Sequence, residues 1–196
     1  MPCGVADPNP QALQLHTLSG CRLAIGRYPA FRYDGRGGGG PGSSSDAALA
    51  FPAETLTIPP LNTATTRFLG LPLPPGLSIG IAAEQLSGRW EPERGAITLQ
   101  FRARFRFRIV AAGRTLYAAP DLQIACALSS DSVQGQRHGA SGQPRAADGR
   151  TRLVGVARVE PCGDPWLDRF LGLPDEALAV LECRILPSSA ERPNGE

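Results

Sequence analysis

The sequence from Leu99 to Ile109 reads LQFRARFRFRI and alternates apolar and polar residues without a break. Side chains along a β-strand point to opposite faces with a period of two, so this pattern predicts one long strand with an apolar face and a cationic face. A helix would spread the arginines around its circumference and bury some of them. We therefore expect an all-β, mainly antiparallel fold: a single β-barrel or curved sheet with one or two short helices capping an end.

The apolar face of this strand can be read in two ways. Burial of a large apolar side chain contributes roughly 1.5–3 kcal/mol, so these residues are core residues first. In a barrel that is not fully packed, they would line a cavity for an apolar ligand instead. The candidate cavity residues are Phe101, Phe105, Phe107, Ile109, Leu128 and Trp90.

The cationic face offers a candidate anion site, because guanidinium groups match carboxylates and phosphates. The alternative is a solvated sheet face whose charge is partly neutralised by acidic neighbours such as Glu84, Glu91 and Glu93. The residues concerned are Arg102, Arg104, Arg106 and Arg108.

Composition excludes several function classes. The chain has 196 residues, the size of one domain, and a net charge of +2, which is too small to predict a nucleic-acid partner. All 20 basic residues are arginine, and a GC-rich bacterial genome is the simplest explanation. The absence of lysine excludes a Walker A loop, a Schiff-base enzyme and a kinase-type nucleotide site.

The cysteines and the N-terminal sequence favour a cytoplasmic location. The five cysteines have no Cys-x-x-Cys pair and no zinc-module spacing, as expected for reduced, buried thiols. No signal peptide is recognisable, and no stretch reaches the roughly 18 apolar residues of a membrane helix.

The chain divides into a single β-rich domain over residues 11–187, with a disordered N-terminus over 1–10 and a disordered tail over 188–196. The Gly- and Ser-rich stretch within 35–46 predicts a flexible loop. It contains a formal G-x-G-x-x-G, but a proline and serines follow where a phosphate-binding helix should begin. Besides the long strand over 96–110, strands are expected at 21–28, around Leu49 and Phe51 and then over 55–58, and at 77–81, 85–90, 116–119, 122–130, 153–159 and 179–186. A helix is an alternative for 175–183.

One short helix has complete start and stop signals. Asp164 is an N-cap, Pro165 occupies the first helical position, and Gly172 with Pro174 ends the helix. The end of this segment repeats an earlier one, because residues 67–72 and 169–174 both read RFLGLP. The repeat indicates either an ancient duplication or, as we favour, one helix-stop sequence that arose twice.

The apolar, proline-rich segment 68–77 has two interpretations. Its leucines fold back as a lid over the core, or they form an exposed patch that docks on a membrane or a protein partner. The candidate docking residues, including two from the short helix, are Phe68, Leu69, Leu71, Leu73, Trp166 and Phe170.

No catalytic or metal-binding constellation is recognisable, and we expect no cofactor. The two histidines, His16 and His138, have no ligand spacing, and no G-x-S-x-G is present. Asp164 and Asp168 lie one helical turn apart, but capping explains them better than acid–base chemistry.

Three hypotheses of function follow. The leading one is a non-enzymatic protein that binds an apolar or amphipathic small molecule, such as a lipid, isoprenoid or pigment, inside the barrel. The alternative is a peripheral membrane or complex-assembly protein that docks through residues 68–77. The third is an enzyme with an unrecognised site, for example one that pairs His138 with Asp148.

Overall fold

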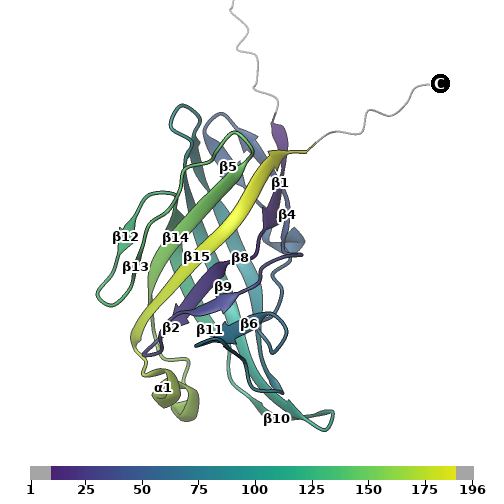
Figure 1. Cartoon of the computed structure of the whole chain (residues 1–196), viewed down its shortest axis with the longest axis vertical. Helices are drawn as coiled ribbons and strands as arrows, with labels where there is room; N and C mark the ends of the chain where they lie inside the picture. Colours follow the sequence, from purple (N-terminus) through teal and green to yellow (C-terminus); the bar gives the residue numbers. More distant parts are fainter. Residues whose placement is uncertain (1–9, 189–196) are drawn as a thin grey trace, which may run out of the picture.

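The alternating stretch around Leu99 forms the centre of a large antiparallel sheet in the computed structural model, which describes residues 10–188 (Figure 1). The strands are β1 (Gln11–Thr17), β2 (Cys21–Ile25), β3 (Phe31–Tyr33), β4 (Gly39–Ser45), β5 (Ala48–Ala50), β6 (Thr66–Phe68), β7 (Leu71–Pro72), β8 (Leu77–Glu91), β9 (Ala96–Ala111), β10 (Arg114–Ala118), β11 (Leu122–Ser129), β12 (Val133–Gln134), β13 (Gly139–Ala140), β14 (Arg150–Val159) and β15 (Asp175–Pro187). The helices are a 3-10 turn at Ala53–Thr55 and α1 (Pro165–Leu171). The predicted disordered ends fall almost entirely outside the described residues.

Strand β9 confirms the predicted alternation. Leu99, Ala103 and Phe105 are buried, whereas the arginines between them face outward. Its partner β8 is one strand of 15 residues rather than the two short strands predicted over 77–81 and 85–90. A register shift between Ala83 and Gln85 interrupts the sequence pattern there without ending the strand.

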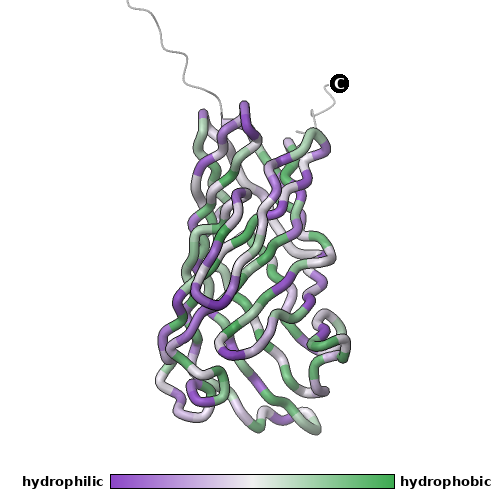
Figure 2. The backbone as a smooth tube through the Cα atoms, turned by 60° about the vertical axis from the view of Figure 1, so that its left-hand side comes forward, coloured by the Kyte–Doolittle hydropathy of each residue, from purple (hydrophilic) through white to green (hydrophobic). Residues whose placement is uncertain are grey.

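The sheet closes on itself. Its hydrogen-bonded path runs through eight strands and returns to the first, because β1 pairs with both β4 and β15. The ring therefore consists of β1, β4, β5, β8, β9, β11, β14 and β15. This arrangement confirms the predicted all-β fold class, and it makes the domain a tall barrel whose strands alternate between hydrophobic and hydrophilic residues (Figure 2).

The two ends of the barrel differ. At one end β15 pairs with β1, and at the other it pairs with β2, which continues into β3, β6 and β7. Helix α1 and strand β10 lie at this second end, at the bottom of Figure 1. We call it the helix end, and we call the end near Leu13 and Pro187 the terminal end.

The predicted flexible loop at 35–46 is wrong for most of its length, because Gly39–Ser45 forms strand β4 between β1 and β5. The glycines serve close packing here. A Cβ at Gly42 would lie 2.3 Å from the Phe51 ring, and one at Gly39 would lie 2.0 Å from the Leu15 carbonyl oxygen. Only glycine lets this strand approach its neighbours so closely.

The strand predicted at 179–186 is confirmed, which excludes the alternative helix, and two other strand predictions differ from the structure. The alternative helix over 175–183 is part of β15, where Ala177 and Cys183 face the core in strand alternation. The predicted strand at 55–58 is instead the end of the 3-10 turn followed by a single bridge from Thr57 to Gly39. Strand β2 stops at Ile25 instead of residue 28, because Gly26 turns the chain with a φ of +67°.

Helix α1 is confirmed with the predicted caps. The Asp164 carboxylate accepts a hydrogen bond from the Leu167 backbone N–H at 2.8 Å, and Gly172 ends the helix with a φ of +74°. The first copy of the repeated hexapeptide behaves differently. Its Leu69 and Gly70 form the turn of the β6–β7 hairpin, both with positive φ. The interpretation of both copies as a helix stop is therefore wrong.

Two main clusters of buried side chains fill the barrel, one towards each end. Leu13, Leu99 and Leu153 belong to the cluster at the terminal end, and Phe107 and Leu167 belong to the one at the helix end. A third, small cluster lies outside the barrel wall, where Val133 and Ala140 of the β12–β13 hairpin pack against Val154. Among residues 10–188, no helix is long and apolar enough to cross a membrane.

Candidate functional site

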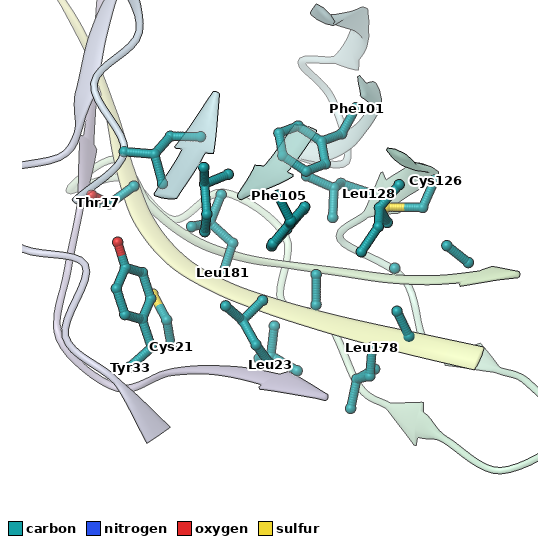
Figure 3. A pocket seen from close by; sticks show the side chains of 18 of the residues that line it. Thr17, Cys21, Leu23, Tyr33, Phe101, Phe105, Cys126, Leu128, Leu178 and Leu181 are labelled. Atoms are coloured by element: carbon teal, nitrogen blue, oxygen red, sulfur yellow. The ribbon is translucent and has the colours of Figure 1, made fainter. Parts of the chain in front are cut away.

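A small cavity lies in the middle of the barrel, and we call it the central cavity (Figure 3). Its volume is about 110 Å³, and its walls are almost entirely apolar. Cys21 and Tyr33 lie on one side, and Phe101, Phe105 and Leu128 contribute from the β9 and β11 walls. Three of the predicted cavity residues thus meet here.

A larger cavity of about 400 Å³ lies at the helix end, and we call it the helix-end cavity. Phe107 and Ile109, two further predicted cavity residues, form part of its wall. Arg108 is the one charged residue in a lining that is otherwise apolar or aromatic. Ile25 borders both cavities, so they lie next to each other in the molecule.

The lid of the helix-end cavity comes from segments far apart in sequence. Leu73, Pro74 and Leu77 of the proline-rich segment line it, and so do Leu167 and Leu171 of α1. The leucines of segment 68–77 therefore divide their roles, because Leu73 faces the cavity whereas Leu69 and Leu71 are exposed. Leu73 therefore forms part of a lid, as one interpretation of this segment expected. Leu69 and Leu71 form an exposed apolar surface, as the other expected.

Helix α1 is held in place through its last turn. The Arg27 backbone N–H donates to the Leu171 carbonyl oxygen at 2.9 Å, and the Gly26 N–H donates to the Glu176 carbonyl oxygen at 3.0 Å. The Arg27 guanidinium also donates to the Arg169 carbonyl oxygen. The two bonds from Arg27 connect the helix that covers the cavity to the segment after strand β2, and the Gly26 bond joins the same segment to strand β15.

Five aromatic rings form a continuous chain around this cavity. Tyr28 contacts Phe68 at 6.3 Å and Phe170 at 5.1 Å between ring centroids. Phe170 stacks on Trp166 at 5.2 Å, and Trp166 meets Tyr117 edge-on at 5.0 Å. With Phe31 and Phe107, seven of the twelve aromatic residues of the chain line this one cavity. The rings come from the β2–β3 connection and from β3, β6, β9, β10 and α1.

The exposed apolar side chains gather at the same end. All six large hydrophobic residues that the described chain leaves exposed lie on the β6–β7 turn, the β9–β10 hairpin or α1. We call this set the apolar rim: Leu69, Leu71, Val110, Leu116, Trp166 and Phe170. Trp166 and Phe170 belong to both the rim and the cavity wall, so the cavity wall extends to the surface at these two side chains.

The arginine face of β9 is partly neutralised. Arg104 lies 2.8 Å from Glu84, as the sequence suggested, and both Arg104 and Arg106 reach Asp121 at 3.6 and 3.1 Å. Asp121 lies after β10 in the chain, so its ion pairs with Arg104 and Arg106 form only when the chain folds back on β9. Glu91 pairs with Arg94 instead. Arg102 and Arg108 have no acidic partner within 4.0 Å among residues 10–188.

Trp90 is the predicted cavity residue that lines neither cavity. It packs beside the core cluster of the terminal end, and the Arg145 guanidinium lies 5.2 Å above its ring. Conversely, sequence reasoning missed Tyr28, Phe31 and Tyr117. Tyr28 and Tyr117 have no aromatic residue two positions away to mark their direction, and Phe31 lies on a strand of only three residues.

The polar groups near the helix-end cavity serve structural roles. Asp164 caps α1, and Asp168 accepts hydrogen bonds from the backbone N–H groups of Cys162 and Gly163 at 2.8 and 3.0 Å. Burial, with the Asp164 carboxylate nearby, raises the pKa of the Tyr117 hydroxyl to about 12. The hydroxyl therefore stays protonated at neutral pH.

The structure does not bring together the groups of the enzyme hypothesis. His138 lies beside Glu176 at the start of β15, whereas Asp148 pairs with Arg184 near the end of that strand. Burial raises the pKa of the Cys126 thiol to about 11, and it also raises the pKa values of Cys21 and Cys183. These thiols are neutral at pH 7. No cluster of three or more potential metal ligands occurs among residues 10–188.

Comparison of the chain with protein-family models, curated proteins and solved structures gave no match.

Proposed function

We propose that this protein binds an apolar or amphipathic small molecule, such as a lipid, an isoprenoid or a pigment, in the helix-end cavity. One observation carries the proposal. A cavity of about 400 Å³ is lined by apolar and aromatic side chains, and its wall includes the half-exposed rings of Trp166 and Phe170. The walls of such a cavity are poorly hydrated, and the free energy falls when an apolar molecule covers them.

Size distinguishes the two cavities. Ligand pockets typically measure roughly 300–1,000 Å³, and the helix-end cavity lies within this range. The central cavity of about 110 Å³ is smaller than an engineered apolar cavity of about 150 Å³ that accommodates benzene. We therefore assign binding to the helix end, and we assign Phe101, Phe105 and Leu128 to the core around the central cavity.

The wall chemistry limits the kind of ligand. Apart from Arg108, no charged side chain borders the helix-end cavity, so few polar contacts would orient a bound molecule. An apolar chain or ring system would occupy the interior. The polar end of an amphipathic ligand would remain at the mouth, where water can solvate it.

The two tryptophans provide a test, because Trp166 lines the cavity and Trp90 lies near the terminal end. A dansyl-labelled fatty acid bound in the helix-end cavity should accept fluorescence energy from Trp166 in Trp90→Phe. Transfer from Trp90 in Trp166→Phe should be much weaker, while the dansyl emission itself still reports binding. Equal transfer in both variants, or no saturable binding, would contradict the proposal.

Two matched substitutions locate the site independently. Leu73 and Leu23 are both half-buried leucines, but Leu73 lines the helix-end cavity and Leu23 lines the central one. Leu73→Phe should narrow the proposed site and raise the Kd for the dansyl fatty acid about tenfold, and Leu23→Phe should leave it unchanged. The reverse result would move the site to the barrel centre.

A further inference from the structure

The apolar rim is a surface feature that ligand binding does not explain. Leu69 and Leu71 are 76% and 70% exposed and contribute to neither cavity. Leu116 on the β9–β10 hairpin is 67% exposed. Exposed apolar groups gathered on one part of a protein mark contact sites, whereas single scattered ones need no explanation.

The rim is surrounded by positive charge. Arg67 precedes Phe68, Arg114 lies on the same hairpin as Leu116, and Arg169 lies between rim residues on α1. These arginines and Arg27 are exposed and have no acidic partner within 4.0 Å among residues 10–188. We call them the arginine collar: Arg27, Arg67, Arg114 and Arg169.

The acidic groups of α1 do not neutralise this collar through ion pairs. The carboxylates of Asp164 and Asp168 accept hydrogen bonds from the backbone at the helix N-terminus. Glu160 and Asp175, at the adjoining ends of β14 and β15, pair with Arg158 and Arg137 instead. The charge of the collar arginines is therefore not neutralised by an ion pair. The Arg27 and Arg67 guanidinium groups donate to backbone carbonyl oxygens, but each keeps further N–H groups that can bind external anions.

A row of like charges adds a second observation. Arg22 of β2 lies opposite Arg32 of β3, and Arg32 lies opposite Arg67 of β6. All three side chains are exposed on the outer face. Like charges directly opposite each other on neighbouring strands are destabilising, so an anionic surface that covers this face would relieve the repulsion.

From these features we infer that the helix end docks on an anionic phospholipid bilayer. The rim side chains enter the interface, where tryptophan is favoured, and the collar arginines bind lipid phosphates. The apolar rim matches the apolar interior of the bilayer, and the arginine collar, which has no acidic partner, matches its anionic headgroups. The docking inference goes beyond the proposed cavity function and does not require it, although docking would bring the cavity mouth to the bilayer.

Vesicle flotation tests this inference. The full-length protein should float with vesicles of phosphatidylcholine and phosphatidylglycerol, and much less with phosphatidylcholine alone. Binding should weaken as salt rises, because the lipid charge is screened. The double variant Leu69→Asp/Leu71→Asp should lose flotation. Its fold should be retained, as checked by near-UV circular dichroism, because both side chains are exposed in the wild-type protein.

Charge-reversal variants provide the matched comparison. Arg67→Glu and Arg169→Glu should each lower the partition coefficient at least about fivefold, the contribution expected of one basic residue near an anionic membrane. Arg89→Glu makes the same charge change on β8 near the terminal end, where Arg89 is exposed and also lacks an ion pair, and it should have no effect.

Three results would overturn the inference. The wild-type protein could fail to float with either vesicle type, or Arg89→Glu could weaken binding as much as Arg67→Glu. Alternatively, sedimentation velocity without vesicles could show a dimer that Leu69→Asp/Leu71→Asp dissociates. That result would identify a second copy of the chain as the occupant of the rim.

Discussion

The rings of Trp166 and Phe170 stack on the surface of α1 with an interplanar angle of 5° and a centroid separation of 5.2 Å. The two residues lie one helical turn apart, so the geometry of α1 places their rings next to each other. Both rings are about half exposed and both line the helix-end cavity. The stack therefore keeps a large apolar surface at the cavity mouth instead of in the core.

Phe170→Ala should remove the contacts of this ring with Trp166 and Tyr28. Aromatic pairs contribute about 0.5–1.5 kcal/mol beyond area burial, so the free energy of unfolding should fall by about 1–2 kcal/mol. Urea denaturation measures this loss. Phe170→Leu, which keeps apolar volume, should recover part of it. Equal losses in both variants would show that ring stacking contributes nothing.

Gly26→Ala should loosen α1 from the barrel. A Cβ at Gly26 would lie 2.0 Å from the Leu171 carbonyl oxygen, at a residue with a φ of +67°. Gly113 has a similar φ of +73° with no atom within 4 Å of its Cβ position. We expect Gly26→Ala to destabilise the protein by at least about 2 kcal/mol and Gly113→Ala by about 1 kcal/mol. Equal losses would contradict the close contact at Gly26.

Ser130→Ala should leave a buried donor without a partner. The Ile97 backbone N–H donates to the Ser130 hydroxyl oxygen at 2.9 Å, and Ser130 is 2% exposed. The expected loss in the free energy of unfolding is about 1–3 kcal/mol, measured by denaturation. The adjacent Ser129 hydroxyl accepts from the Asp131 N–H at the surface, so Ser129→Ala should change stability by less than about 1 kcal/mol.

The β12–β13 hairpin should open at acid pH. Burial raises the pKa of the Glu176 carboxyl, but hydrogen bonds from the backbone N–H groups of Gln136, His138 and Arg137 outweigh this and lower it overall. A carboxyl whose pKa is lowered on folding stabilises the protein above its unfolded pKa. That stabilisation is lost as the pH falls through the folded pKa.

Hydrogen exchange measures this opening. The amides of Gln136 and His138 should lose protection as the pH falls below the ordinary carboxyl range, after correction for the intrinsic exchange rate. Glu176→Gln should already show the low-protection behaviour at neutral pH. If protection in the wild-type protein is independent of pH, the Glu176 carboxylate does not hold the hairpin.

Sequence reasoning succeeded where one local pattern determines the structure. The alternation over Leu99–Ile109 predicted strand β9, because successive side chains of a strand point to opposite faces. Asp164 and Gly172 marked the bounds of α1, because caps satisfy backbone groups locally. Reasoning failed at Gly39–Ser45, where glycine composition suggested flexibility but tertiary contacts required residues without side chains.

The candidate site was only partly predictable for a related reason. Phe107, Ile109, Trp166 and Phe170 belong to patterned elements, so they could be nominated from the sequence. Tyr28 joins the cavity because β2 pairs with the distant strand β15, and Tyr117 joins it because β10 folds back on β9 and places Tyr117 opposite Ile109. The size and position of the two cavities likewise depend on how side chains fill the barrel, which no sequence pattern predicts.

Methyl NMR with a titrated medium-chain fatty acid locates the bound ligand within the barrel. Ile79 and Ile109 line the helix-end cavity, whereas Ile97 and Ile185 are buried in the core cluster of the terminal end. We predict saturable shifts of the Ile79 and Ile109 methyl resonances, with those of Ile97 and Ile185 unchanged. Shifts confined to the terminal-end isoleucines, or no shifts at saturating fatty acid, would contradict the proposed binding site.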